Sequence, residues 1–267
     1  MHHYFCGWYV KCQSDTQTMA IIPAIHEGNR SIQLITDEGA WNVSHLCGNY
    51  FFSRNGMKIQ LHTDDLDLAG EVTFSHLTPV KYDIMGPFRY VPFMECRHSV
   101  ISMRHRVDGE MHINGVHYQF DNALGYIEGD RGYSFPAEYA WTHCFFEGGS
   151  LMLSAGNIPF CGGHFTGVIG VILWQDREYR IATYFGARVV KMADGAMVIT
   201  QGSYQFTAKL IEKRSHPLYA PVNGHMIRTI HESACCHAMY SFSKNGQILF
   251  AFETDRASFE FEYGGEI

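Results

Sequence analysis

The chain has 267 residues, of which 46% are apolar, and a formal net charge of −7 with only 20 lysines and arginines. This length and apolar content suffice for a large buried core, and the acidic balance gives no positive field for phosphates, so we expect no nucleic-acid partner and no anionic bilayer. No run approaches the roughly 18 to 20 apolar residues of a membrane span, and residues 1–8 lack a secretory pattern, so we expect a cytoplasmic protein with no membrane span.

Short runs rich in β-branched and aromatic residues follow one another along the chain and are separated by turn dipeptides. The runs cover residues 31–36, 99–107, 167–174, 196–204 and 247–253. The dipeptides, each suited to a tight hairpin, are Glu38-Gly39, Asn55-Gly56, Asp108-Gly109, Asn114-Gly115, Asp194-Gly195, Asn223-Gly224 and Asn245-Gly246. This spacing predicts an antiparallel meander.

Helix is expected to be scarce, because no window of a dozen residues shows a helical period, and residues 215–224 with their two prolines read as an extended connection. A meander of this length closes into barrels or stacks as a sandwich, since a flat sheet would expose an apolar face and two edges. The composition changes after the basic strand 97–107 and its partner 111–120. We therefore place a domain boundary there, with domains at 1–122 and 123–267.

The segment that follows this boundary carries a recognisable pattern. Residues 124–141 read LGYIEGDRGYSFPAEYAW, which resembles the signature of the tocopherol cyclase-like family. The opening residues 5–11 and the closing residues 252–259 are similar to the first and last strands of that family, so the resemblance spans the chain. Three positions depart from the family pattern: Cys6, Arg131 and His143.

The resemblance implies an all-β fold of two antiparallel lipocalin-like barrels, with a possible exchange of terminal strands. It also implies a reaction without metal or organic cofactor, in which an acid protonates a prenyl double bond and an oxygen traps the cation to close a ring. Related folds include a carotenoid hydratase and lipocalin-like pericyclic cyclases. The implied partner is an apolar small molecule such as a prenylated quinol, a terpenoid or a polyene.

Glu128 and Asp130 are the candidate catalytic residues. If residues 124–130 form a strand, its period of two places Tyr126, Glu128 and Asp130 on one face, with the carboxylates roughly 7 Å apart. Burial and a neighbouring negative charge keep a carboxyl protonated, as alkene protonation requires. In the alternative interpretation, this segment is a β-bulge or corner, and both acids only pair with nearby arginines.

Aromatic and polar side chains complete the predicted site. A carbocation gains roughly 0.5 to 2 kcal/mol over a well-placed ring. The candidate ligand-binding residues are Trp8, Tyr126, Tyr133, Phe135, Tyr139, Trp141, His143, His98 and Arg104. The aromatic residues suit plain core packing equally well, and His98 and Arg104 also fit a solvated hairpin face.

We predict no metal site, because the pairs Cys96/His98 and Cys235/His237 have no closely spaced second pair and no two-histidine-one-carboxylate motif accompanies them. Two functions from different classes remain open. The first is an intramolecular cyclase, or a related isomerase or hydratase, with Glu128 as proton donor. The second is a non-catalytic carrier or sensor of an apolar ligand, since fold alone does not decide function.

Overall fold

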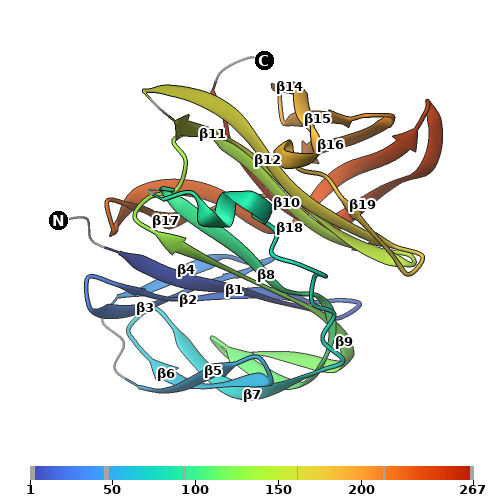
Figure 1. Ribbon diagram of the computed structural model, residues 1–267. Coiled ribbons are helices and arrows are strands. Elements are labelled where there is room, and N and C mark those ends of the chain that lie inside the picture. The colour runs from blue at the N-terminus through green and yellow to red at the C-terminus, as the bar shows by residue number, and fades with distance from the viewer. Residues whose placement is uncertain (1–3, 45–47, 93, 161, 213, 265–267) are drawn as a thin grey trace.

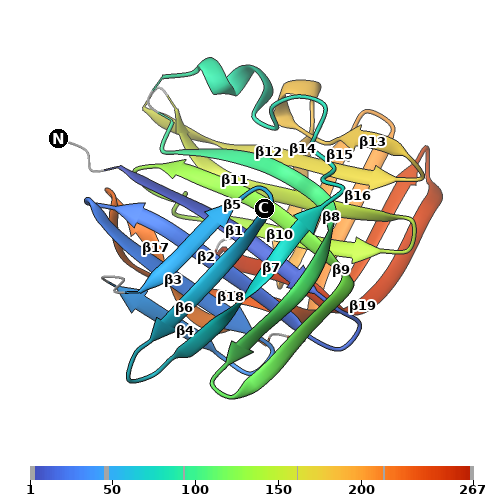
Figure 2. The same cartoon turned by 90° about the horizontal axis from the view of Figure 1, so that it is seen from below.

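The computed structural model describes residues 4–44, 48–92, 94–160, 162–212 and 214–264. It contains two large antiparallel sheets, each built from a continuous stretch of the chain. Figure 1 shows the first sheet, blue to green, below the second, green to red, and Figure 2 shows the strands of the first sheet in front of those of the second. The predicted all-β, lipocalin-like architecture is therefore confirmed.

The first sheet has the strand order β4-β3-β2-β1-β9-β8-β7-β6-β5. Its strands are β1 (Phe5–Gln13), β2 (Thr18–His26), β3 (Asn29–Thr36), β4 (Ala40–Ser44), β5 (Asn49–Ser53), β6 (Gly56–His62), β7 (Asp67–Ser75), β8 (Cys96–Ile113) and β9 (Val116–Gly132). A crossing segment between β7 and β8 carries the short 3₁₀ helix η1 (Gly86–Tyr90).

The second sheet has the order β13-β12-β11-β10-β19-β18-β16-β15-β14, and β17 pairs with β18. Its strands are β10 (Tyr139–Phe146), β11 (Gly149–Phe160), β12 (Gly163–Trp174), β13 (Arg177–Arg180), β14 (Arg188–Ala193), β15 (Ala196–Gln201), β16 (Tyr204–Glu212), β17 (His216–Val222), β18 (His225–Lys244) and β19 (Gln247–Glu262). A second 3₁₀ turn, η2 (Thr183–Phe185), precedes β14.

The change from one sheet to the other falls between Gly132 and Tyr139. The predicted boundary after residue 122 lies inside β9, all of which pairs with β1 and β8 of the first sheet. The terminal strands stay with their own halves, since β1 pairs in the first sheet and β19 in the second. The division into two domains is a proposal that these pairings support at a boundary near residue 135.

Most of the predicted hairpin turns are present, and Asn-Gly and Asp-Gly sequences dominate them. At Asn114-Gly115, for example, both residues have positive φ, 48° and 82°, as a type I′ turn requires. Asp108-Gly109 was wrongly predicted as a turn. It lies within β8 at a register shift. A Cβ atom on Gly109 would lie 2.3 Å from the carbonyl oxygen of Glu71, so only glycine allows the neighbouring strand to approach this closely. The predicted connection 215–224 is strand β17, which pairs with β18.

Three apolar clusters form among the described residues. One lies within the first sheet, around Ile21, Leu34 and Met111, and a second lies within the curve of the second sheet. The third contains residues of both sheets, among them Tyr126 of β9 and Trp141 of β10. The sheets are therefore joined through a core of their own.

Hydrogen bonds also cross between the sheets. The Gln33 side chain of β3 bonds both the N–H and the carbonyl of Tyr219 in β17, at 2.7 and 2.9 Å. The buried Lys11 of β1 donates to Ser258 Oγ of β19 at 2.8 Å. Among the described residues, no helix has the length and apolar content that crossing a membrane requires.

Candidate functional site

Alternation along β9 produces the first part of the site. Tyr126 and Glu128 point into the space between the sheets and are buried, whereas Ile127 points the other way, into the core of the first sheet. Asp130 follows on the same face as Glu128, and both line a cavity. The face predicted from the period of two is therefore formed.

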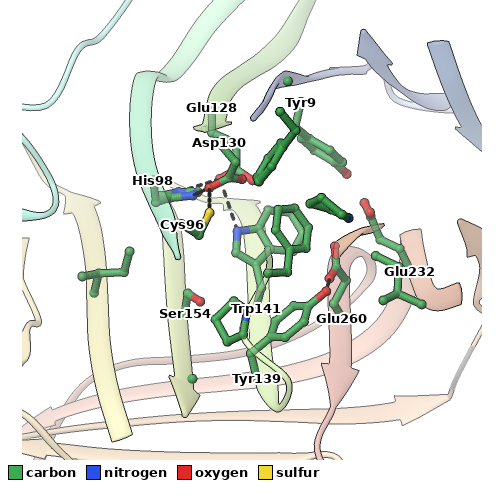
Figure 3. Close-up of a pocket in the computed structure, with 18 of the residues that line it drawn as sticks. Tyr9, Cys96, His98, Glu128, Asp130, Tyr139, Trp141, Ser154, Glu232 and Glu260 are labelled. Carbon is green, nitrogen blue, oxygen red and sulfur yellow. Dashed lines mark hydrogen bonds and ion pairs between the residues drawn. The ribbon is translucent and has the colours of Figure 1, made fainter. Parts of the chain in front are cut away.

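His98 of β8 lies between these two carboxyl groups. It is directly opposite Asp130 in the strand register. Its Nδ1 is 2.9 Å from Asp130 Oδ1 and its Nε2 is 3.1 Å from Glu128 Oε2, as Figure 3 shows. Burial lowers the pKa of His98, but the charges of Asp130 and Glu128 more than offset this effect, so its pKa lies well above the ordinary value. The ring is thus an imidazolium between two acids, and Cys96 also donates to Asp130.

Donors from both sheets converge on one oxygen of Glu128. The hydroxyl of Tyr126 in the first sheet and the indole N–H of Trp141 in the second sheet, the latter at 3.2 Å, both donate to Oε2, the atom that faces His98. Glu128 is only 4% exposed. This arrangement holds the carboxyl in place and stabilises the negative charge that develops on Oε2 when the carboxyl gives up a proton.

A second acidic group occupies the wall formed by the second sheet. Glu232 of β18 and Glu260 of β19 are paired in register and buried. The Tyr139 hydroxyl donates to Glu260. Burial raises the pKa of Glu232 well above its ordinary value, with a further contribution from the charge of Glu260, and burial raises the pKa of Glu260 as well. These carboxyls therefore retain at least one proton at neutral pH.

The cavity between these groups has mainly apolar walls. Its volume is about 180 Å³, more than ten times what a single water needs in the same measure. Its lining includes apolar side chains from β1, β2, η1, β10, β12, β17 and β18, among them Trp8, Ile22, Phe88, Trp141, Ile169, Leu218 and Ile230. The space suits an apolar small molecule with a few polar contacts.

The structure brings together seven of the eleven predicted site residues at this cavity. These are Trp8, His98, Glu128, Asp130, Phe135, Tyr139 and Trp141. Tyr126 does not line the cavity, but its hydroxyl donates to Glu128, which does. His143 lies behind Tyr126, with the two rings stacked at 3.8 Å.

Tyr133 and Arg104 do not line the cavity. The backbone of Tyr133 bonds Glu95 and Gly224. Arg104 is exposed, because two register shifts in β8 between Val100 and His105 break the alternation that His98 sets. His98 therefore lines the cavity and Arg104 does not.

Sequence reasoning missed Tyr9, Glu232 and Glu260. Glu232 and Glu260 are more than 100 positions from Glu128 along the chain, and only the packing of the two sheets makes all three line one cavity. Neither glutamate belongs to a motif that could have identified it.

The structure is similar to solved structures, although comparisons of the sequence find no match. No family model matches the chain, and no curated protein sequence matches it. Kievitone hydratase from Nectria haematococca is similar in structure, with a TM-score of 0.57, 9% identity, and coverage of 98% of this chain and 89% of that one. CghA, solved with Sch210972, gives a TM-score of 0.63, 8% identity, and coverage of 98% and 89%. The fold is therefore shared with a hydratase and with CghA.

Two clusters of described residues bring three potential metal ligands within 4.8 Å of one another. In the first, His98, Glu128 and Asp130, the two ring nitrogens of His98 face different carboxyl groups. The second, Glu110, His112 and His117, is exposed on the β8–β9 hairpin. It is a two-histidine-one-carboxylate set that the sequence spacing did not reveal, because the hairpin places His112 opposite His117.

Proposed function

We propose that this protein is a cofactor-independent cyclase, or a related hydratase or isomerase, that acts on an apolar prenylated or polyene molecule held between the two sheets. The observation that carries the proposal is Glu128, a buried carboxyl on the wall of an apolar cavity with its Oε2 held by donors from both sheets. The narrower resemblance to tocopherol cyclases stays a prediction and guides the choice of test compound.

The proposed reaction begins with proton transfer from the carboxyl of Glu128 to an alkene carbon of the substrate. The carboxylate left behind is stabilised by Tyr126, Trp141 and the His98 imidazolium, whose contacts all use Oε2. These three contacts disperse the charge that the carboxyl acquires as it gives its proton to the alkene. Asp130 fixes the ring of His98 through its other nitrogen.

The carbocation that follows is held among aromatic rings. Trp8, Tyr9 and Trp141 line the cavity, and Tyr9 and Trp141 pack edge to face at 5.3 Å. In a cyclase, a hydroxyl of the substrate attacks the cation, closes the ring and returns its proton to Glu128. In a hydratase, water attacks instead and its second proton returns to the same carboxylate. Folding the chain so that nucleophile and alkene touch supplies the remaining rate enhancement.

Organic extraction of the freshly purified protein, followed by mass spectrometry, first tests whether an apolar molecule occupies the cavity. A geranyl-substituted hydroquinone is then incubated with the protein. A product of unchanged mass with one double bond fewer indicates cyclisation, and a gain of one water indicates hydration. Binding without any chemical change would favour the non-catalytic carrier.

Glu128→Gln separates catalysis from binding. General-acid catalysis contributes about 10² to 10⁴-fold, so we expect turnover to fall by at least 100-fold while probe affinity changes little. Glu110→Gln, on the exposed end of the neighbouring strand β8, is the matched control and should keep full activity. Full turnover in Glu128→Gln would refute the role of this carboxyl.

A further inference from the structure

The carboxyl pair on the second-sheet wall has no role in the proton transfer described above. Glu232 and Glu260 are 2% and 8% exposed, and they lie directly opposite one another in the strand register. Two buried carboxyl groups on paired positions of neighbouring strands cannot both ionise easily, so they share one proton and carry about one negative charge together. Such a charge in an apolar wall needs a partner.

Other side chains of the protein supply only some of the hydrogen bonds that the Glu232–Glu260 pair can accept. Tyr139 donates to Glu260, whereas the hydroxyl of Tyr9 donates to Ser258. Glu232 Oε1 is buried and has no hydrogen-bond partner among the described residues, although its side chain lines the cavity. Buried acceptors are almost always paired in folded proteins. The orphaned oxygen therefore marks a position where a bound molecule supplies the donor.

The charges around the cavity limit what that donor can be. The lining contains four carboxyl groups, those of Glu128, Asp130, Glu232 and Glu260, against the single imidazolium of His98, with no lysine or arginine among the described residues that form it. The nearby Lys11 ammonium is directed to Ser258 and to the carbonyl of Arg256 instead. An anionic ligand is repelled by this set, whereas a cation is attracted.

We propose that the Glu232–Glu260 pair binds a protonated amine, so that the ligand is an apolar, terpenoid-like molecule with a cationic head group. The ammonium donates to Glu232 Oε1, and its positive charge compensates the shared negative charge of the pair. The rings of Tyr9 and Tyr139 line the same cavity, and Tyr139 already donates to Glu260. The apolar body then extends towards Trp141 and Glu128. This inference rests on the proposed function, because it assumes that the ligand occupies the same cavity.

Three probes with one hydrocarbon chain test the head-group preference: geranylamine, geraniol and geranic acid. Trp8 and Trp141 line the cavity, so quenching of tryptophan fluorescence reports binding. We expect geranylamine to bind at least tenfold more tightly than geraniol, and geranic acid to bind most weakly. Geraniol offers a hydrogen-bond donor without a charge, so it separates the effect of hydrogen bonding from the effect of positive charge.

Glu232→Gln should reduce the affinity for geranylamine by about tenfold or more and change that for geraniol by less than threefold. Glu253→Gln is the matched control, since this residue lies on the same strand as Glu260 and is exposed on the surface, and it should leave all three affinities unchanged. Thermal unfolding of each variant shows whether it is folded. The comparison of the three probes on the unaltered protein does not depend on any variant.

The outcomes distinguish this inference from the proposed function. Equal affinities, or tightest binding of geranic acid, overturn the cationic head group and leave the cyclase or hydratase proposal in place. Absence of binding by all three probes contradicts the cavity as a ligand site and removes both proposals. A preference for geranylamine that persists unchanged in Glu232→Gln shows that another group recognises the amine and refutes the assignment to this pair.

Discussion

Lys11 is a fully buried lysine, and its replacement by methionine gives a quantitative test of the interface between the sheets. Its ammonium donates to Ser258 Oγ at 2.8 Å and to the carbonyl of Arg256 at 3.3 Å. Burial lowers its pKa from 10.5 to about 8. At about 1.4 kcal/mol per pKa unit, burying the charged form costs about 3 kcal/mol.

The sign of the pH dependence follows from the number of bound protons. Below pH 8 the lysine is protonated in both the folded and the unfolded state, and the folded protein bears the full cost. Between pH 8 and pH 10.5 the unfolded chain holds a proton that the folded protein lacks, so the free energy of unfolding rises with pH. Lys11→Met removes this contribution and leaves the tyrosine and cysteine titrations, which cancel when the two proteins are compared.

At pH 7 the variant gains about 3 kcal/mol from the absent charge and loses two hydrogen bonds of about 1 kcal/mol each. We therefore expect Lys11→Met to be about 1 kcal/mol more stable at pH 7. Ser258 Oγ keeps its contacts with Tyr9 and Ala234, so no hydroxyl is orphaned. At pH 10 the order reverses, because the advantage of the variant shrinks by about 2 to 3 kcal/mol.

Urea unfolding of both proteins at pH 7, 8, 9 and 10, followed by far-UV circular dichroism, measures this difference. A difference that does not change with pH would show that the ammonium is not desolvated in the folded protein. A variant several kcal/mol less stable at pH 7 would show that the hydrogen bonds across the sheets outweigh the buried charge. Either result would refute the reasoning.

Four further substitutions test packing and the buried acids, each by urea unfolding. In Gly125→Ala the new Cβ would lie 2.1 Å from Nε2 of the buried His105, so we expect a loss of about 1 to 3 kcal/mol. Burial raises the pKa of Glu260 from 4.5 to about 7. Between these pH values the folded protein binds more protons than the unfolded chain, so the free energy of unfolding of the unaltered protein should fall as pH rises from 4.5 to 7. Glu260→Gln should reduce this fall. Leu34→Ala, in the core of the first sheet, should cost about 2 to 5 kcal/mol, whereas Ile248→Ala, at a position 64% exposed, should change stability by less than about 0.5 kcal/mol.

The hairpins were predictable because their signal is local. Asn114-Gly115 and Asn245-Gly246 adopt positive φ at both positions, and the residue types alone predict that conformation. Asp108-Gly109 has the same local sequence, yet it forms a bulge, since the decisive contact is with the backbone of Glu71 in another strand. Local chemistry cannot tell a turn from a bulge when the partner strand decides.

The site residues likewise fall into those that a local pattern predicts and those that depend on contacts between distant strands. Period two along β9 was sufficient to place Glu128 and Asp130 on one face. The position of Arg104 required knowledge of the register shifts in β8, which follow from pairing with β9. The second acidic group was beyond reach from sequence, because Glu260 meets the cavity only through the packing of β19 against the other sheet. Contacts between distant segments, and not the residue types themselves, define that half of the site.

Each sheet is built from one continuous stretch of the chain, and this has a consequence for biosynthesis. The first sheet is complete at Gly132, so all of its strands can pair before the second half has left the ribosome. During that interval the side of the sheet that carries Tyr126 and Glu128 has neither its apolar cover nor the indole of Trp141. The nascent chain thus presents an unprotected acidic and aromatic surface for the time needed to synthesise the remaining strands, and this stage of translation is the one at which a chaperone would find most to bind.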